Sequence, residues 1–235
     1  MKNLKKFVLF IGFVLFANIL FAQKTQQNRE VSNFQKIEIS GPFNVRISQD
    51  GNEKLSIEAN KDIIDNIETE VSNGMLKVRM KNSFKNWKNA DNGSMNVQIS
   101  CKNLEAISGS AAADISSGTI IKNTNFKVNA SSAAEIEMSL EVDNLNIDAS
   151  SGADVNLKGN TQKLSVDISS GADLKAYDLK AENVKVDASS GADAKVFVSK
   201  EIDANASSGA EISYKGEPTK EKVKSSSGGD VNRKN

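Results

Sequence analysis

Carboxylates recur at a nearly constant spacing through the second half of the chain, 18 to 21 residues apart. Stacked one above another in a fold, such groups would repel by about 1 kcal/mol per neighbouring pair even at the dielectric of water. A basic ligand or a cation would relieve that repulsion, and Ca²⁺ takes carboxylate, carbonyl and hydroxyl oxygens as ligands. The repeated acids, which are the candidate ligand- or cation-binding residues, are Asp114, Glu135, Asp154, Asp173, Asp193, Glu211 and Asp230.

Two interpretations of this acidic column stay open. Lys175, Lys195 and Arg233 follow their acids by two or three residues, which favours a solvated column neutralised by its own bases. The alternative is a binding site, for which calcium is the cofactor to expect, although the glycine-rich nonapeptide of calcium-binding β-rolls is absent. A second, shorter column consists of Asp148, Asp167 and Asp187.

The composition argues against catalysis. The chain has no His, the commonest general base and metal ligand. Its many Ser residues therefore lack the partner that would activate a nucleophile. Paired carboxylates can hydrolyse glycosidic bonds at the right separation, but these acids are spread evenly rather than clustered. We predict a protein that is not an enzyme, with a β-helical polysaccharide hydrolase or lyase as the alternative.

The acids belong to a repeat that predicts the fold. Residues 149–155 read Ala-Ser-Ser-Gly-Ala-Asp-Val, and apolar residues alternate with polar ones both before and after the Ser-Ser-Gly step. Alternation with period two indicates a strand with one buried face. Two strands and two bends in about 19–20 residues make one coil, which must stack on others to bury its apolar face. The predicted fold class is all-β, a right-handed parallel β-helix (solenoid), the hand following the usual crossover preference.

Small residues mark the bend of each coil. Five repeats have glycine at the position of Gly152, and two have alanine there, Ala112 and Ala133. Because positive φ is costly for Ala, we predict that crowding, and not a positive φ, selects small residues here. The Ser hydroxyls are expected to bond the backbone of the bend.

The chain begins with a predicted signal peptide over residues 1–22. Lys2, Lys5 and Lys6 precede an apolar run, and Ala22 ends a cleavage site of the small-residue type. An uncleaved membrane anchor is the alternative, but the run is short for a span, so we expect no transmembrane anchor after cleavage. We then expect a disordered linker over 23–33, irregular N-terminal coils with a cap over 34–107, and the regular repeat over 108–235, with 34–235 as one continuous domain.

The first third contains several local signals. Ser40-Gly41-Pro42 aligns with the later bends, so that Ser40 matches Ser150 and Asn44 matches Asp154. Residues 61–67 have the spacing of one helical turn, and Asn73-Gly74 is typical of a hairpin. Phe84 and Trp87 fall in a polar loop over 81–93, either as an aromatic-basic binding patch or folded over the core. Further candidates for an aromatic ladder are Tyr177, Phe197 and Tyr214, the first two expected to face outward.

Charge and cysteine content limit the partners. Removal of residues 1–22 takes three of the 30 basic residues and none of the 30 acidic ones, which leaves a net charge of −3. This argues against nucleic-acid binding, which normally needs a basic face. Cys101 is the only cysteine, so no intramolecular disulfide forms, and we expect it to be a buried small hydrophobe. The C-terminal coil is a candidate surface for homo-oligomerisation.

The opening segment at 34–45, Phe-Gln-Lys-Ile-Glu-Ile-Ser-Gly-Pro-Phe-Asn-Val, together with the Ser-Ser-Gly-Ala-Asp repeat, resembles a known family. It is similar to the head GIN domain family, auto-transporter adhesin head domains common in Bacteroidetes, over residues 34–231. The resemblance implies a secreted β-helical protein. We therefore predict export to the periplasm, the outer-membrane surface or the extracellular space, and an adhesive or cell-envelope binding role, with a glycan or a surface protein as partner.

Overall fold

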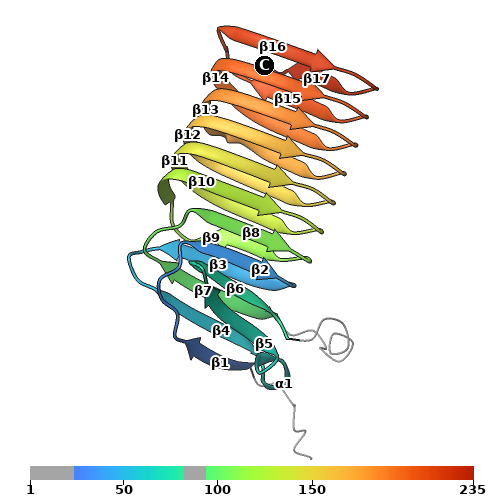
Figure 1. Cartoon of the computed structure of the whole chain (residues 1–235). Coiled ribbons are helices and arrows are strands. Elements are labelled where there is room, and N and C mark those ends of the chain that lie inside the picture. Colours follow the sequence, from blue (N-terminus) through green and yellow to red (C-terminus); the bar gives the residue numbers. More distant parts are fainter. Residues whose placement is uncertain (1–23, 82–93) are drawn as a thin grey trace, which may run out of the picture.

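The computed structural model describes residues 24–81 and 94–235. The predicted signal peptide, and the loop with Phe84 and Trp87, lie outside the described residues. Within the described part, the strands stack in one column and the single short helix, α1 (Lys61–Ile64), lies near its lower end (Figure 1). The predicted all-β solenoid is confirmed, and the structure takes the predicted turn of helix over 61–64.

Each regular coil has two strand faces that meet at two edges. At the turn edge the chain reverses in the Ser-Ser-Gly bends, which lie one above another (Figure 1). At the rounded edge, one long strand passes from the first face to the second. Successive coils pair in parallel, residue on residue. The long strands are β11 (Glu135–Ala149), β12 (Asp154–Ile168), β13 (Asp173–Ala188) and β14 (Asp193–Ala206).

Shorter strands complete both faces above and below. β9 (Asp114–Ser117), β15 (Glu211–Lys215) and β17 (Asp230–Arg233) extend the first face. β8 (Ala106–Ser110), β10 (Ile121–Ala130) and β16 (Lys220–Ser225) extend the second. The period-two alternation of the sequence thus becomes two packed sheets.

The first coil of the chain is not the first coil of the stack. β2 (Lys36–Ser40) and β3 (Phe43–Gln49) form a coil in register with the regular ones, and Ser40 and Asn44 pair with Ser110 and Asp114 as the alignment predicts. Below it, however, lie β6 (Met75–Met80) and β7 (Met95–Cys101), which come later in the chain. The β2–β3 coil is therefore inserted between two coils that follow it in sequence.

The lower end of the stack is built from antiparallel strands. β4 (Lys54–Asn60) pairs with β7, and β5 (Ile67–Ser72) pairs with β6 through the predicted hairpin. Asn73 and Gly74 have φ values of 51° and 72°, the two positive values that a type I′ turn requires. The right-handed winding and the capping role of this region stay predictions.

The predicted disordered linker is wrong for residues 24–29. They form β1 (Lys24–Arg29), which pairs antiparallel with β4 along its whole length. The polar sequence gives no apolar alternation there, because β1 lies at the end of the stack and both of its sides remain partly exposed. Its backbone satisfies the otherwise free edge of β4, and this edge pairing is what orders the segment.

One hydrophobic core runs through the stack. Ile136, Val155, Leu174 and their equivalents lie above one another in register and are fully buried. Cys101 belongs to this core as predicted. Burial, with smaller effects from the charges of Asp50 and Glu53, raises the pKa of its thiol to about 11. The thiol is therefore protonated and unreactive at neutral pH.

The upper end of the core carries charge at inward positions. In the last coil, Glu221 pairs in register with buried Ile202 of the coil below, and Arg233 pairs with buried Tyr214. A guanidinium nitrogen of Arg233 lies 3.8 Å from one carboxylate oxygen of Glu221, and the Tyr214 hydroxyl donates a hydrogen bond to the other. Inward-facing charge is a common protection of a sheet edge. Self-association through this coil stays a prediction.

Candidate functional site

The bends at the turn edge require two successive residues with positive φ. Ser151 has φ 55° and Gly152 has φ 69°, and the amide of Ala153 donates to the Ser150 carbonyl at 3.3 Å. A Cβ on Gly152 would meet nothing within 4 Å, and Ala133 occupies the equivalent place at φ 58°. The prediction of crowding is therefore wrong. The left-handed backbone selects glycine, and Ala is tolerated there at about 1–2 kcal/mol.

Backbone hydrogen bonds join the bends of successive coils. The amide of Gly152 donates to the Ser170 carbonyl at 3.1 Å, and the amide of Asp173 donates to the Ala153 carbonyl at 2.9 Å. In the described part of the chain, the side chains of the paired turn serines from 131 to 227 make no hydrogen bonds, so the predicted bonds from their hydroxyls are not formed. The equivalent hydroxyl one coil below, that of Ser110, does donate to a backbone carbonyl, that of Ile39, at 3.5 Å. Between Ser131 and Ser227, backbone hydrogen bonds and not serine hydroxyls join the bends.

The predicted acids form one continuous column on the first face, directly after the bends. Each pairs in register with the next, so that all seven lie side by side. Six are exposed and Asp173 is half-buried. We call these seven residues the acidic column: Asp114, Glu135, Asp154, Asp173, Asp193, Glu211 and Asp230.

Lysine neutralises only part of the acidic column. The Lys175 ammonium lies 3.0 Å from an oxygen of Asp154 and 3.8 Å from one of Asp173. Its pKa is raised, first by the hydrogen bond to Asp154 and then by the charge of Asp173. Lys234 approaches Glu211 at 3.8 Å. The predicted neutralisation by Lys195 and Arg233 is not formed. Among the described residues, no ion pair reaches the other four acids, which are Asp114, Glu135, Asp193 and Asp230.

One oxygen of the acidic column lacks a donor. Asp173 Oδ1 is buried and has no hydrogen-bond partner among the described residues. An unsatisfied buried acceptor costs free energy.

The second acidic column lies on the other side of the same edge. Asp148, Asp167 and Asp187 pair in register on the second face. Lys127 lies 2.6 Å from Asp148, and Lys185 lies 3.1 Å from Asp187. The turn edge therefore carries carboxylates on both sides. Yet no group of three or more Asp, Glu, Cys or His side chains converges as a metal site in the described part, so the predicted calcium has no preformed cluster there.

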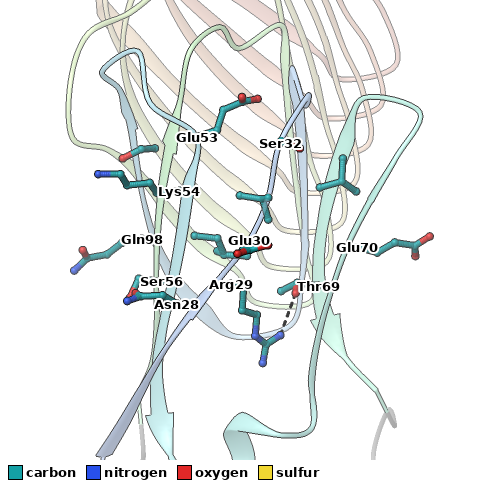
Figure 2. Close-up of a pocket in the computed structure, with 14 residues that line it drawn as sticks. Asn28, Arg29, Glu30, Ser32, Glu53, Lys54, Ser56, Thr69, Glu70 and Gln98 are labelled. Carbon is teal, nitrogen blue, oxygen red and sulfur yellow. Dashed lines mark hydrogen bonds between the residues drawn. The ribbon is translucent and has the colours of Figure 1, made fainter.

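A groove that the sequence does not indicate lies at the lower end of the stack. Its volume is about 1230 Å³, and it is bounded by β1, β4 and β5 (Figure 2). Arg29 crosses toward β5, where its guanidinium donates to the carbonyls of Ile67 at 2.7 Å and Ile64 at 3.0 Å and to the Thr69 hydroxyl at 3.1 Å. Burial lowers the pKa of Arg29, and the charge of Asp65 opposes that effect. Arg29 therefore ties the two faces together at this end.

Glu53 holds the segment that leaves this groove for β2. Its carboxylate accepts the backbone amide of Asn33 at 2.7 Å and lies 2.7 Å from the Lys102 ammonium. The hydrogen bond from Lys102, with smaller contributions from the Asn33 and Phe34 amides, lowers the pKa of Glu53. These contacts join residues from three distant segments, which is why no local signal in the sequence indicates them.

The Glu53 contacts predict a pH dependence. A lowered folded pKa means that this attachment is complete above the unfolded pKa of about 4.3. It is lost as the pH falls through the lower folded value. An NMR titration should therefore show the Asn33 amide proton moving upfield at a pH below the ordinary range of Glu, and Glu53→Gln should abolish that transition. A midpoint at or above the ordinary value would contradict the assignment.

The predicted aromatic ladder is not formed. Phe197 pairs in register with Lys180 rather than with Tyr177, because the register shifts within β13. The Lys180 ammonium lies 3.9 Å from the centre of the Phe197 ring, and Lys215 lies 5.0 Å from that of Tyr177. Both rings are half-buried at the rounded edge, whereas Tyr214 is buried. The aromatic residues thus position lysines there.

The fold and the acidic edge define a β-solenoid with a repetitive polar surface. The chain belongs to the family described as "Putative auto-transporter adhesin, head GIN domain", which it matches over residues 33–218. No protein of curated function matches it. The resemblance to this family is therefore confirmed.

Solved structures share this fold. A "putative adhesin" from Bacteroides fragilis is 22% identical with a TM-score of 0.82, the match covering 90% of this chain and 97% of that one. A "putative lipid binding protein" from Parabacteroides distasonis is 20% identical with a TM-score of 0.72 and the same coverage. A "putative adhesin" from Parabacteroides merdae is 16% identical with a TM-score of 0.71, covering 91% of this chain and 97% of that one. At these identities the likeness concerns the fold.

Proposed function

We propose that this protein is an exported, non-enzymatic binding protein of the adhesive type, whose acidic column contacts a basic partner. The adhesin description of its family supports the binding role. The even spacing of the acids, one coil apart, favours an extended contact surface over a catalytic cleft. Such a surface suits a Lys- or Arg-rich patch on another protein of the cell envelope or its surroundings.

The incomplete neutralisation of the acidic column carries this proposal. Seven carboxylates stand side by side, and ion pairs reach only three of them in the described residues. Repulsion between neighbours makes the isolated column electrostatically unfavourable. A basic partner would remove that repulsion and would be steered toward the edge by its field.

We place the protein outside the cytoplasm. The basic and apolar opening at 1–22 supports export, and an adhesin-type family suits the cell surface. In residues 24–81 and 94–235, no helix is long and apolar enough to cross a membrane. The site of action that we propose is the periplasm, the outer surface or the extracellular space.

Neutralising the acidic column should weaken binding to a basic probe. We expect D154N/D173N/D193N to weaken binding to immobilised polylysine about tenfold, from roughly half a kcal/mol for each exposed charge contact. A panel of basic extracellular proteins should respond in the same way. Surface plasmon resonance at low and high salt would measure the loss, which salt should reduce.

A matched control separates the column from net charge. D148N/D167N/D187N removes three charges from the same edge on the second face, and we expect it to retain binding within about threefold. Equal losses in both triple variants would show that net charge alone governs binding and would overturn the proposal. A chelator arm tests calcium, because binding through a bound cation would disappear in chelator whereas direct contact would not.

A further inference from the structure

A second groove lies on the rounded edge, away from the acidic column. Its volume is about 500 Å³, and it crosses the coils of β11, β12, β13 and β14. Val142, Thr161 and Ala181 are successive in register and buried, and they form its floor. The groove therefore runs along the axis of the solenoid.

Polar side chains form the two walls of this groove. Glu141, Asn160 and Lys180 follow one another in register along one wall. Asp143, Gln162 and Glu182 occupy the position after the floor residues and form the other. The coils of β11, β12 and β13 thus each contribute one polar side chain to each wall, at a spacing of about 4.8 Å, and β14 adds Ser199 at the end of the groove.

Contacts outside the groove hold the walls in place. Lys122 lies 2.7 Å from Glu141, and Lys200 lies 2.7 Å from Glu182. Lys180 is held over the Phe197 ring. Within the second wall, the Gln162 amide donates to a carboxylate oxygen of Asp143 at 3.0 Å. The polar groups are therefore positioned before any ligand arrives, which lowers the entropic cost of binding.

The chemistry of the walls selects an uncharged ligand. Three carboxylates, Glu141, Asp143 and Glu182, are balanced by three lysines, at 122, 180 and 200. Carboxylate and amide oxygens accept hydrogen bonds, while ammonium and amide N–H groups donate them. Hydroxyl groups do both, so a ligand with many hydroxyls can use both walls. A polyanion would be repelled by the three carboxylates, and an apolar chain would leave the polar groups of the walls without hydrogen-bond partners.

We propose that the rounded-edge groove binds a neutral polysaccharide chain, lying along the axis with successive sugars against successive coils. This site is separate from the acidic column and goes beyond the proposed contact with a basic partner. Because the two sites lie on different edges, one molecule can hold both ligands at once.

The test uses soluble neutral polysaccharides on the full chain. Isothermal titration calorimetry against laminarin, mannan, xyloglucan and dextran should show saturable binding to at least one of them, and polygalacturonate and heparin serve as charged comparators. We expect Q162A/E182A to raise the Kd about tenfold or more. Asn160→Ala, a milder change in the opposite wall, should raise it about threefold. Binding should persist at high salt, because net charge does not drive it.

The control is N146A/D167A, which removes one amide and one carboxylate from the second face. It should keep the wild-type Kd, as should D154N/D173N/D193N. Three results would overturn the proposal: no binding to any of the four neutral polymers, binding to the polyanions alone, or an unchanged Kd in both groove variants. If D154N/D173N/D193N loses polylysine binding but keeps its glycan binding, the two sites are independent.

Discussion

Replacing Gly159 with Ala should destabilise the solenoid by about 3 kcal/mol, at the upper end of the cost of a strained backbone residue. Gly159 has φ 121°, a conformation that L side chains rarely adopt. A Cβ there would overlap the carbonyl oxygen of Leu140, its partner in the coil below. The clash is with backbone, so relief requires that two coils move apart. Urea unfolding followed by far-ultraviolet circular dichroism would measure the change.

Gly152 provides the matched control in the same coil. It also has positive φ, at 69°, but a Cβ would meet nothing within 4 Å. Ala133 occupies the equivalent place in the coil below. Gly152→Ala should therefore cost only about 1 kcal/mol. If both substitutions cost the same, close approach of the backbone does not explain the glycine at 159.

Replacing Arg29 with Met should open the lower end of the stack, with a local loss of about 2 kcal/mol. Met keeps most of the apolar stem but removes every donor. The carbonyls of Ile64 and Ile67 would then lose charged hydrogen bonds that join β1 to the segment leading into β5. Hydrogen–deuterium exchange should become faster in β1 and β5 and stay unchanged in β11 to β14, because repeat proteins open locally.

Arg79→Met serves as the comparison on the surface. The Arg79 guanidinium lies 2.9 Å from Glu68 and 3.9 Å from Glu70, and its side chain is 46% exposed. Exposed ion pairs contribute about 0–1 kcal/mol, so this change should have a small effect. Exchange in β1 that is unaffected by Arg29→Met, or accelerated as much by Arg79→Met, would contradict the role of Arg29 as a tie.

The acidic column can be predicted from the sequence because the spacing of the acids agrees with the alternation of apolar and polar residues around them. One residue of slippage would turn every apolar side chain of a strand outward, so the alternation fixes the register. Once the register is fixed, acids such as Asp154 and Asp173 must lie side by side. The ion pairs of these acids cannot be predicted in the same way. Lys195 follows Asp193 as Lys175 follows Asp173, yet among the described residues only Lys175 makes such a pair.

The bend shows how a correct pattern can receive the wrong physical reason. The alanines at 112 and 133 indicate that small size matters more than a positive φ, but both have positive φ, at 61° and 58°. Sequence alone does not distinguish a crowded position from a left-handed one that Ala occupies at a cost. The empty space around Gly152 decides the question.

The coil, its two buried faces, the register of the acids and the hairpin at Asn73-Gly74 are all predictable from the residues alone, because each depends on contacts within about one repeat. The position of the β2–β3 coil between later coils, and the folding of the polar segment 24–29 into a strand, become apparent only in three dimensions. The same holds for the location of both grooves. These features arise from backbone pairing and side-chain contacts between segments far apart in the chain, and such pairing leaves no periodic signal in either partner.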